Sequence, residues 1–295
     1  MCIIIDNTDQ KWLLALIYTN KYSVSKYKPI AVFDSGLGSL AVVRMLVHEL
    51  PTESIVYFAD RANHPYGAKS REELKNIIAN SIDMLINEYE PKCIVVASIT
   101  PSLLVLDELR LNKRALIFGT YPCIDKASTL SKSKSIAILA SKAVVKSNEL
   151  DDMFKGYISR SRFTAIDASE LISFVENGMF LTSKDKGRGV IERVCIKIKD
   201  DPSIDTIVLG STHLSFIEDS IKELFPNVTI VNPVVYTVAR VKEYLTNHGM
   251  LLGSDDRSKG LLHVLVSKNE HEFVDMLAKM NIRFDDVKFK QVSNY

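Results

Sequence analysis

Short runs of apolar residues alternate with amphipathic segments along most of the chain. The runs at 29–34, 54–60 and 92–98 are nearly continuous stretches rich in Val, Ile, Ala and Phe, without a regular polar alternation. This pattern is typical of strands that are buried on both faces, as in parallel sheets covered by helices. Further runs of the same kind predict strands at 114–119, 135–141, 163–167, 205–211, 228–232 and 263–267.

Helical spacing of apolar residues fills most of the gaps between these runs. The segment 70–89 begins with Ser-Arg-Glu-Glu, which is typical of an N-cap followed by acidic first-turn residues. Thr100 and Pro101 predict another helix start, with Thr as the cap and Pro at the first helical position. A further helix is expected from the 35–39 loop to about residue 50. Together these elements predict an α/β fold, in which functional residues gather at the carboxyl ends of the strands.

Length and composition bound the class of protein. The 295 residues indicate about two domains, at ~150 residues each. The 46% of hydrophobic and 25% of charged residues are ordinary for a globular protein. The formal net charge is +1, so no overall field draws the chain to nucleic acid or to an anionic membrane, and we expect neither as a partner.

The cysteines and the N-terminus add little chemistry. The four cysteines show no CxxC spacing, so we expect neither a metal site nor a disulfide framework. The N-terminus lacks a basic region and a clear cleavage site, and the apolar stretch 12–18 is too short to cross a bilayer. We therefore expect a soluble, cytoplasmic protein. Residues 1–28 stand outside the repeating pattern and form an N-terminal extension in this interpretation.

Four loops after predicted strands combine small and polar residues, at 34–38, 64–67, 95–100 and 209–213. In the first loop, Gly36 and Gly38 allow the backbone to approach a ligand closely. The stretch 36–41 also fits the dinucleotide-binding pattern G-x-G-x-x-A. A single match is weak evidence, and Asp34 directly before the loop would repel a pyrophosphate.

Several side chains in these loops also have simple structural interpretations. Asp34 is as well suited to cap the following helix as to take part in chemistry. His213, taken alone, is more typical of a structural hydrogen-bonding residue than of a catalyst. Ser98 and Ser211, also taken alone, are expected to be helix N-caps. The individual residues leave these alternatives open.

Read together, the loops resemble the glutamate racemase family. Residues 31–38 resemble its F-D-S-G-x-G-G motif, and residues 65–73 resemble its P-Y-G-x-K-S-x-E-E segment. Four further segments resemble the family's V-A-C-N-T, A-T-x-x-T-x-x-S, L-V-E-x-G and L-G-C-T-H motifs. They lie at 95–100, 140–147, 174–178 and 209–213. The resemblance keeps the family's order and covers roughly residues 29 to 280.

The resemblance implies two similar parallel-sheet α/β domains with the active site in the cleft between them. The first domain is expected at 29–121 plus 233–295 and the second at 122–232. The family racemises without a cofactor, using two thiols on opposite faces of the substrate α-carbon. The assisting acid–base positions match Asp34, Glu176 and His213. Positions that line the site of a small amino-acid or dicarboxylate ligand match Ser35, Pro65, Tyr66, Gly67, Ile99, Thr100, Val144 and Thr212.

The sequence departs from the family at the centre of this chemistry. Ser98 and Ser211 stand at the two thiol positions, Ile99 replaces an Asn and Val144 replaces a ligand-binding Thr. A cysteine thiol titrates near ~8.5, and a serine hydroxyl roughly five units higher. At ~1.36 kcal/mol per unit, forming the alkoxide costs about 7 kcal/mol more than forming the thiolate. That is roughly five decades in the population of the active base.

Three hypotheses remain open at this point. The first is a family member that keeps the ligand site but has lost or strongly reduced racemase activity. The second is an active amino-acid racemase or isomerase that moves the α-proton with Asp34, Glu176 or His213 as bases. The third is a hydrolase with Ser98 or Ser211 as nucleophile, although no G-x-S-x-G elbow surrounds either serine. No cofactor is expected, and a homodimer is left open.

Overall fold

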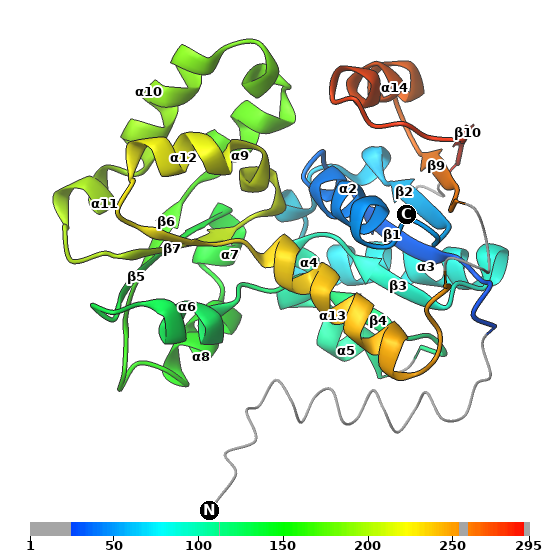
Figure 1. The fold of residues 1–295 in the computed structure, drawn as a ribbon, viewed down its shortest axis with the longest axis horizontal. Helices are drawn as coiled ribbons and strands as arrows, with labels where there is room; N and C mark the ends of the chain where they lie inside the picture. The colour runs from blue at the N-terminus through cyan, green and yellow to red at the C-terminus, as the bar shows by residue number, and fades with distance from the viewer. Residues whose placement is uncertain (1–24, 112, 254–258, 292–295) are drawn as a thin grey trace, which may run out of the picture.

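The computed structural model describes residues 25–111, 113–253 and 259–291, so residues 1–24 of the expected extension lie outside the described residues. It contains two separate parallel sheets, which confirms the predicted α/β fold class. Sheet A has six strands in the order β10-β9-β2-β1-β3-β4, and sheet B has four in the order β6-β5-β7-β8. Sheet A with its helices is called the first unit below, and sheet B with its helices the second unit. The two units lie side by side in Figure 1.

The strands of sheet A are β1 (Ile30–Asp34), β2 (Ile55–Ala59), β3 (Cys93–Val96), β4 (Ile117–Gly119), β9 (Leu262–Val266) and β10 (Asp286–Phe289). The helices of the first unit are α2 (Ser39–Glu49), η1 (Arg61–Asn63), η2 (Tyr66–Ala68), α3 (Arg71–Tyr89), α4 (Ile99–Leu104), α5 (Leu106–Arg110), α13 (Pro233–Asn247) and α14 (Glu270–Lys279).

The strands of sheet B are β5 (Ser135–Ala140), β6 (Arg162–Asp167), β7 (Thr206–Gly210) and β8 (Thr229–Val231). The helices of the second unit are α6 (Ile124–Leu130), α7 (Lys142–Val145), α8 (Asn148–Lys155), α9 (Ser169–Glu176), η3 (Met179–Leu181), α10 (Lys184–Val194), α11 (Ile196–Asp200), η4 (Thr212–Ile217) and α12 (Glu218–Leu224).

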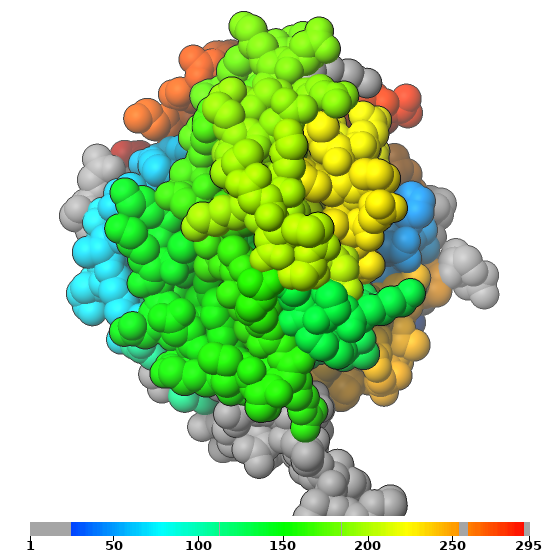
Figure 2. All heavy atoms as spheres, turned by 90° about the vertical axis from the view of Figure 1, so that its left-hand side faces the viewer, coloured from blue at the N-terminus to red at the C-terminus, as the bar shows by residue number. Residues whose placement is uncertain are grey.

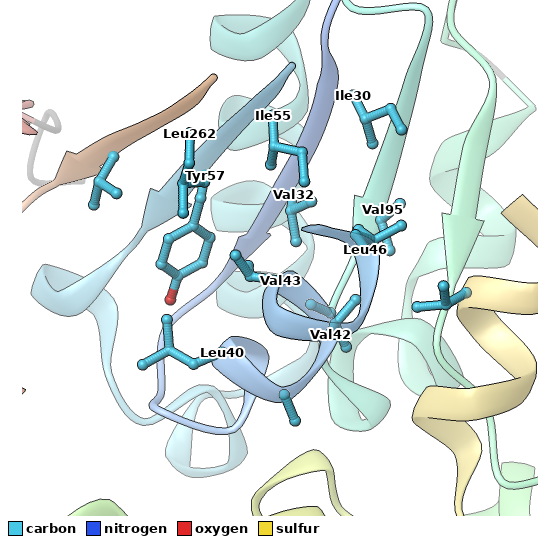
Figure 3. Close-up of a cluster of buried hydrophobic side chains, with 14 of the residues drawn as sticks. Ile30, Val32, Leu40, Val42, Val43, Leu46, Ile55, Tyr57, Val95 and Leu262 are labelled. Carbon is cyan, nitrogen blue, oxygen red and sulfur yellow. The ribbon is translucent and has the colours of Figure 1, made fainter. Parts of the chain in front are cut away.

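Both faces of sheet A are buried, which explains its continuous apolar strands. Val32, Tyr57 and Val95 point to the face covered by α2 and α13, where they pack with Leu40 and Leu46 of α2 (Figure 3). Their neighbours along the strands point to the opposite face, under α3. This alternation follows from the two-residue period of a strand, and it removes apolar side chains from water on both sides.

Sheet B is covered in the same way. One face packs against α9, α10 and α12, and the other against α6, α7 and α8. In the view of Figure 2 the second unit faces the reader, and parts of the first unit are visible at its sides. Ile99, at the start of α4 in the first unit, belongs to the apolar cluster on the face covered by α6, α7 and α8, and Leu103 of α4 and Tyr236 of α13 pack against this cluster. An apolar contact therefore joins the two units.

Most element predictions are confirmed. Every predicted strand is found, and the largest displacement of an end is three residues, at 114–119, where β4 begins at Ile117. Ser70 caps α3 as predicted, because its side chain accepts a hydrogen bond from the Glu73 amide. The predicted helix start at Thr100 is wrong, since α4 begins at Ile99. Pro101 is accommodated in its first turn, where an amide hydrogen has no partner within the helix.

The parallel register brings the strand ends of sheet A to one edge. Phe33 of β1 pairs with Phe58 of β2 and with Val96 of β3. The loops that follow these strands, beginning with Asp34, Asp60 and Ala97, therefore emerge next to one another. This edge faces α9 and η4 of the second unit.

Candidate functional site

Asp34 ends β1 in a buried position, with 2% of its surface exposed. Its Oδ2 accepts a hydrogen bond of 3.3 Å from the Gly36 amide, and the Ser98 side chain lies near its carboxylate. Burial raises the pKa of Asp34 to about 6, although the nearby His213 and hydrogen bonds act in the opposite direction. Asp34 is therefore a carboxyl group that exchanges its proton near neutral pH.

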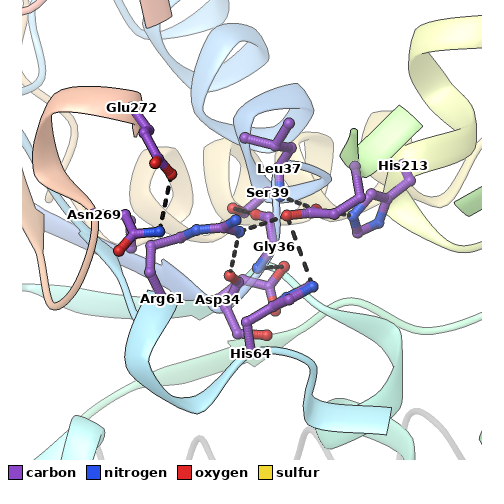
Figure 4. A network of polar contacts seen from close by, with 12 residues as sticks. Asp34, Gly36, Leu37, Ser39, Arg61, His64, His213, Asn269 and Glu272 are labelled. Carbon is purple, nitrogen blue, oxygen red and sulfur yellow. Dashed lines mark hydrogen bonds and ion pairs between the residues drawn. The ribbon is translucent and has the colours of Figure 1, made fainter. Parts of the chain in front are cut away.

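Glu176, the last residue of α9, reaches from the second unit into the first. Its Oε2 accepts from the Leu37 amide at 2.8 Å and lies 2.8 Å from Nε2 of His213. Its Oε1 accepts from Nη1 of Arg61 at 2.6 Å and lies 3.7 Å from Nε2 of His64. Four nitrogen groups thus converge on one carboxylate. Figure 4 labels the four residues that supply them, Leu37, Arg61, His64 and His213.

The partners of Glu176 decide its charge. Burial alone would raise the pKa of Glu176, but the hydrogen bond and charge of His213, with the charges of Arg61 and His64, lower it to about 2. Glu176 is consequently ionised at every pH near neutrality. Burial lowers the pKa of His64 below its usual value of 6.5.

His213 lies in η4, directly after β7, and is 8% exposed. Both of its ring nitrogens have partners, since Nδ1 lies 3.3 Å from Oγ of Ser211 and Nε2 lies 2.8 Å from Glu176. An imidazole between a hydroxyl and an ionised carboxylate has a defined tautomer, with the Nε2 hydrogen directed to Glu176. Nδ1 is then free to accept the proton of the Ser211 hydroxyl.

The two glycines of the first loop allow the units to meet. A Cβ atom at Gly38 would lie 2.4 Å from Nδ1 of His213 and 2.5 Å from Oγ1 of Thr212. A Cβ at Gly36 would lie 2.9 Å from Nε2 of His213 and 3.0 Å from Oε2 of Glu176. The G-x-G pattern is thus explained by the close approach of the second unit to this loop.

The loops that carry the two serines are also in contact. Oγ1 of Thr212, the residue after Ser211, donates to the backbone oxygen of Ala97, the residue before Ser98, at 3.4 Å. Neither serine side chain makes the capping hydrogen bond expected from its position at a helix start. Ser98 instead contacts Asp34, and Ser211 contacts His213. Both hydroxyls therefore face titratable groups.

The expected ligand-contacting residues other than Thr212, Ile99 and Val144 are divided among three environments. Ser35 is buried beside the network, where its carbonyl accepts from Arg61 at 2.8 Å. The Tyr66 hydroxyl donates to Oδ2 of Asp60 at 2.9 Å, and Pro65 and Gly67 beside it are exposed. Oγ1 of Thr100 lies 3.3 Å from Oγ of Ser141, across the boundary between the units.

Ile99 and Val144 belong to a different environment. They are 3% and 0% exposed and lie in the apolar cluster that includes Ile138 of β5. At these two positions, where the resemblance implies polar ligand contacts, the structure has hydrocarbon packed between α4 and α7. That packing adds to the attachment between the units.

Sequence reasoning missed Arg61, and it named His64 only as the first residue of the candidate loop 64–67. Arg61 donates to both Ser35 and Glu176, and its guanidinium carbon lies 5.7 Å from the ring centroid of Phe273. His64 has a buried Nδ1 without a hydrogen-bond partner among the described residues. The available signal was position alone, because both residues lie in the loop between the β2 end and Pro65.

Within the described parts of the chain, no group of three or more His, Cys, Asp and Glu side chains has a geometry suited to a metal ion. In the same residues, no helix combines the length and the apolar character needed to cross a bilayer.

Comparisons with known proteins agree on one family. The sequence model of the Asp/Glu/hydantoin racemases matches residues 30–241. A glutamate racemase of Clostridium botulinum (strain Loch Maree / Type A3) is 30% identical over 254 residues, covering 86% of this chain and 96% of its own. The glutamate racemase of Clostridium novyi (strain NT) is 28% identical over 255 residues, covering 85% and 95%.

Solved structures show the same fold. The glutamate racemase isoform RacE1 from Bacillus anthracis has a TM-score of 0.81 at 23% identity, covering 90% of this chain and 98% of its own. The glutamate racemase from Francisella tularensis, solved in complex with D-glutamate, has a TM-score of 0.77 at 23% identity, with the same coverage.

Proposed function

The chain belongs to the Asp/Glu/hydantoin racemase family, and from this premise we propose that it binds a small amino-acid or dicarboxylate ligand between its two units with its racemase activity lost or strongly reduced. The observation that carries the proposal is the pair of hydroxyls, Ser98 and Ser211, at the two thiol positions. The proposal places residues 29–121 and 233–295 in one domain and residues 122–232 in the other. It takes the protein to be cytoplasmic and to need no cofactor.

Acidity is the physical reason for the loss. A two-base racemase needs one group that removes the α-proton and an opposite group that returns one. A hydroxyl performs both steps poorly, because its alkoxide is about 7 kcal/mol less accessible than a thiolate. The neighbours of the serines offset this only in part, since Oγ of Ser211 keeps its proton until His213 accepts it.

Glu176 does not replace the missing thiols in this proposal. A carboxylate with a pKa of about 2, surrounded by Leu37, Arg61 and His213, holds a proton weakly. Its interactions favour a fixed charge that orients other groups. Glu176 is therefore a poor carrier of the α-proton.

A second candidate function is favoured by one observation, the raised pKa of Asp34. A carboxyl group with a pKa of about 6 is well matched to proton transfer near neutral pH. In this alternative the protein is an active amino-acid racemase or isomerase, with Asp34 on one face of the substrate and His213 or Glu176 on the other.

The two candidates differ in α-proton exchange. The wild-type protein is incubated in deuterated water with L- and D-glutamate, aspartate and a panel of 2-substituted acids, and binding is measured in parallel by calorimetry. The first proposal predicts that at least one acid binds without measurable deuterium incorporation at its α-carbon. Exchange at a rate of ordinary enzymes, roughly 1–1000 per second, supports the second candidate. A lack of binding to every acid in the panel contradicts the first proposal.

A homodimer is a separate proposal, which is tested by analytical sedimentation.

A further inference from the structure

Three side chains form a continuous hydrogen-bonded row at the junction of the units. Oγ of Ser211 lies 3.3 Å from Nδ1 of His213, and Nε2 of His213 lies 2.8 Å from Oε2 of Glu176. The order of hydroxyl, imidazole and carboxylate is the one that activates a serine nucleophile. We propose that Ser211 is such a nucleophile, with His213 as its base and Glu176 as the orienting carboxylate, and that the site attacks small activated esters.

The charge of Glu176 suits this role. An orienting carboxylate remains ionised throughout the reaction, because it fixes the imidazole tautomer and stabilises the imidazolium. His213 and Arg61 hold the pKa of Glu176 low, and the Leu37 amide also donates a hydrogen bond to it. The Nε2 hydrogen of His213 is thereby directed to Glu176, and the lone pair of Nδ1 to Ser211. The same contacts that make Glu176 a poor proton carrier make it a good orienter.

The ring of His213 is also held in place by packing. The backbones of Gly36 and Gly38 lie so close to it that a Cβ at either position would overlap the ring or its partners. The hydrogen bond from Thr212 to Ala97 fixes the residue between Ser211 and His213. The 3.3 Å separation of Ser211 and His213 is at the long end for a hydrogen bond, as is common for a nucleophile and base without substrate.

The structure distinguishes the two serines that the sequence left equivalent. The hydroxyl of Ser98 interacts with Asp34, a carboxyl group whose pKa is raised to about 6 by burial. The hydroxyl of Ser211 interacts with an imidazole that is itself oriented by a second carboxylate. Of the two, only Ser211 is part of the three-residue row, and the inference is therefore specific to it.

The reaction balances with water as the second reactant. Oγ of Ser211 forms a bond to the ester carbonyl carbon while its proton passes to Nδ1 of His213. The carbon–oxygen bond to the alcohol then breaks, and the alcohol leaves with that proton. Water attacks the acyl-serine and gives a proton to Nδ1. The acid is released, and the proton returns from His213 to Oγ of Ser211.

Covalent labelling of the full chain with a fluorophosphonate tests the proposal. This reagent carries a good leaving group on phosphorus and captures activated serine hydroxyls. We expect a single adduct, located on Ser211 by peptide mass spectrometry. Ser211→Ala should abolish labelling, and Glu176→Gln should slow it at least ~100-fold, because the imidazole loses its orienting charge.

Ser215→Ala is the matched control. Ser215 lies two residues beyond His213, and its hydroxyl donates to Asn232 at 3.0 Å, away from the row. Ser211 of the Ser215→Ala variant should be labelled at the wild-type rate. Circular dichroism verifies that each variant is folded. A failure of the wild type to label contradicts the proposal without any variant. Absence of label on the folded wild type, or an adduct on Ser98 in place of Ser211, would overturn the proposal. Neither result depends on whether the protein binds amino acids or exchanges their α-protons.

Discussion

The chemistry of the site depends on single atoms at two positions. At Ser98 and Ser211, oxygen stands where the resemblance to the family implies sulfur, and each hydroxyl faces a different titratable partner. The partners are Asp34, which is buried and weakly acidic, and His213, which is held by an ionised glutamate. Asp34 therefore exchanges its proton near neutral pH, whereas Glu176, which is also a carboxylate, keeps its charge.

Asp34→Asn should change the pH dependence of stability. The folded pKa of Asp34 is about 6 against 3.8 for the free side chain, so the folded state binds this proton more tightly. Stability of the wild type therefore falls as pH rises between these two values. We expect the stability of Asp34→Asn relative to the wild type to increase by about 1–2 kcal/mol from pH 5 to pH 7.5.

Denaturant unfolding at the two pH values measures this difference. Glu176 does not interfere, since its folded pKa of about 2 and its ordinary value of 4.5 both lie below this range. Asp60, whose pKa is also raised by burial, is the same in both proteins. A constant difference between the two proteins across the range contradicts the buried, protonated state of Asp34.

At the scale of elements, the site is made by loops that end parallel strands. Residues 35–38 between β1 and α2 pack directly on η4, which follows β7. The glycines in this loop exist at this contact because side chains would not fit. The tight approach brings Glu176 and His213 within hydrogen-bonding distance of the first unit.

Gly38→Ala should destabilise the protein and disturb His213. Its added Cβ would lie 2.4 Å from Nδ1 of His213, so the loop or η4 must move. We expect a loss of about 1–3 kcal/mol, as for other overpacked interiors. Thermal and denaturant unfolding provide the measurement, and the His213 ring signals in NMR should shift.

Gly189→Ala is the comparison for this substitution. Gly189 lies inside α10, and the nearest atom to its added Cβ is the end of the Arg193 side chain at 3.7 Å. Replacing a helical glycine with alanine there should stabilise the protein by about 0.5–1 kcal/mol. Equal effects of both substitutions would show that the contact at Gly38 is not tight.

Most helices and strands could be predicted from the sequence, because burial leaves a recognisable pattern of apolar residues. Strands covered on both faces, such as β1, β2 and β7, have continuous apolar sequences. Strand β10 was not predicted, because it is a short edge strand whose side chains are half-buried or exposed. The start of α4 was misplaced because Thr100 and Pro101 gave a local signal, whereas the fold buries Ile99 against the second unit.

The residues of the candidate site could be predicted only in part from the sequence. Asp34, Glu176 and His213 were identified through motifs, and the structure brings these three together. Arg61 was missed and His64 was given no role, because their importance depends on a contact with Glu176 from another unit, more than 100 residues away in the sequence. Single-sequence patterns report local periodicity and contain no direct information on such long-range pairs.

On the scale of the whole molecule, two of the contacts between the units lie in largely buried positions. One is the polar cluster in which Arg61 of the first unit donates to Glu176 of the second. The other is the apolar contact of Ile99 with the cluster that contains Val144. A further ion pair, Arg71 with Glu149, joins α3 to α8 at the surface. These contacts differ greatly in exposure, so their contributions should differ as well.

Arg61→Met should destabilise the molecule more than Arg71→Met. Arg61 and Glu176 are 21% and 11% exposed, so the substitution leaves a largely buried carboxylate short of a partner, at a cost of about 2–4 kcal/mol. Arg71 is 51% exposed, and its loss should cost less than about 1 kcal/mol. Chemical unfolding of both variants measures the difference. Similar midpoints for the two would contradict a structural role for the Arg61 pair.

The central claim is that two hydroxyls have ended proton shuttling in a racemase fold. Its most direct test compares the rate of α-deuterium incorporation into glutamate by the wild type and by Ser98→Cys/Ser211→Cys, under identical conditions. The account predicts no measurable exchange in the wild type and a rate at least ~100-fold above it in the double variant, since each thiol restores about five units of acidity. Exchange by the wild type at a rate equal to that of the double variant would contradict it.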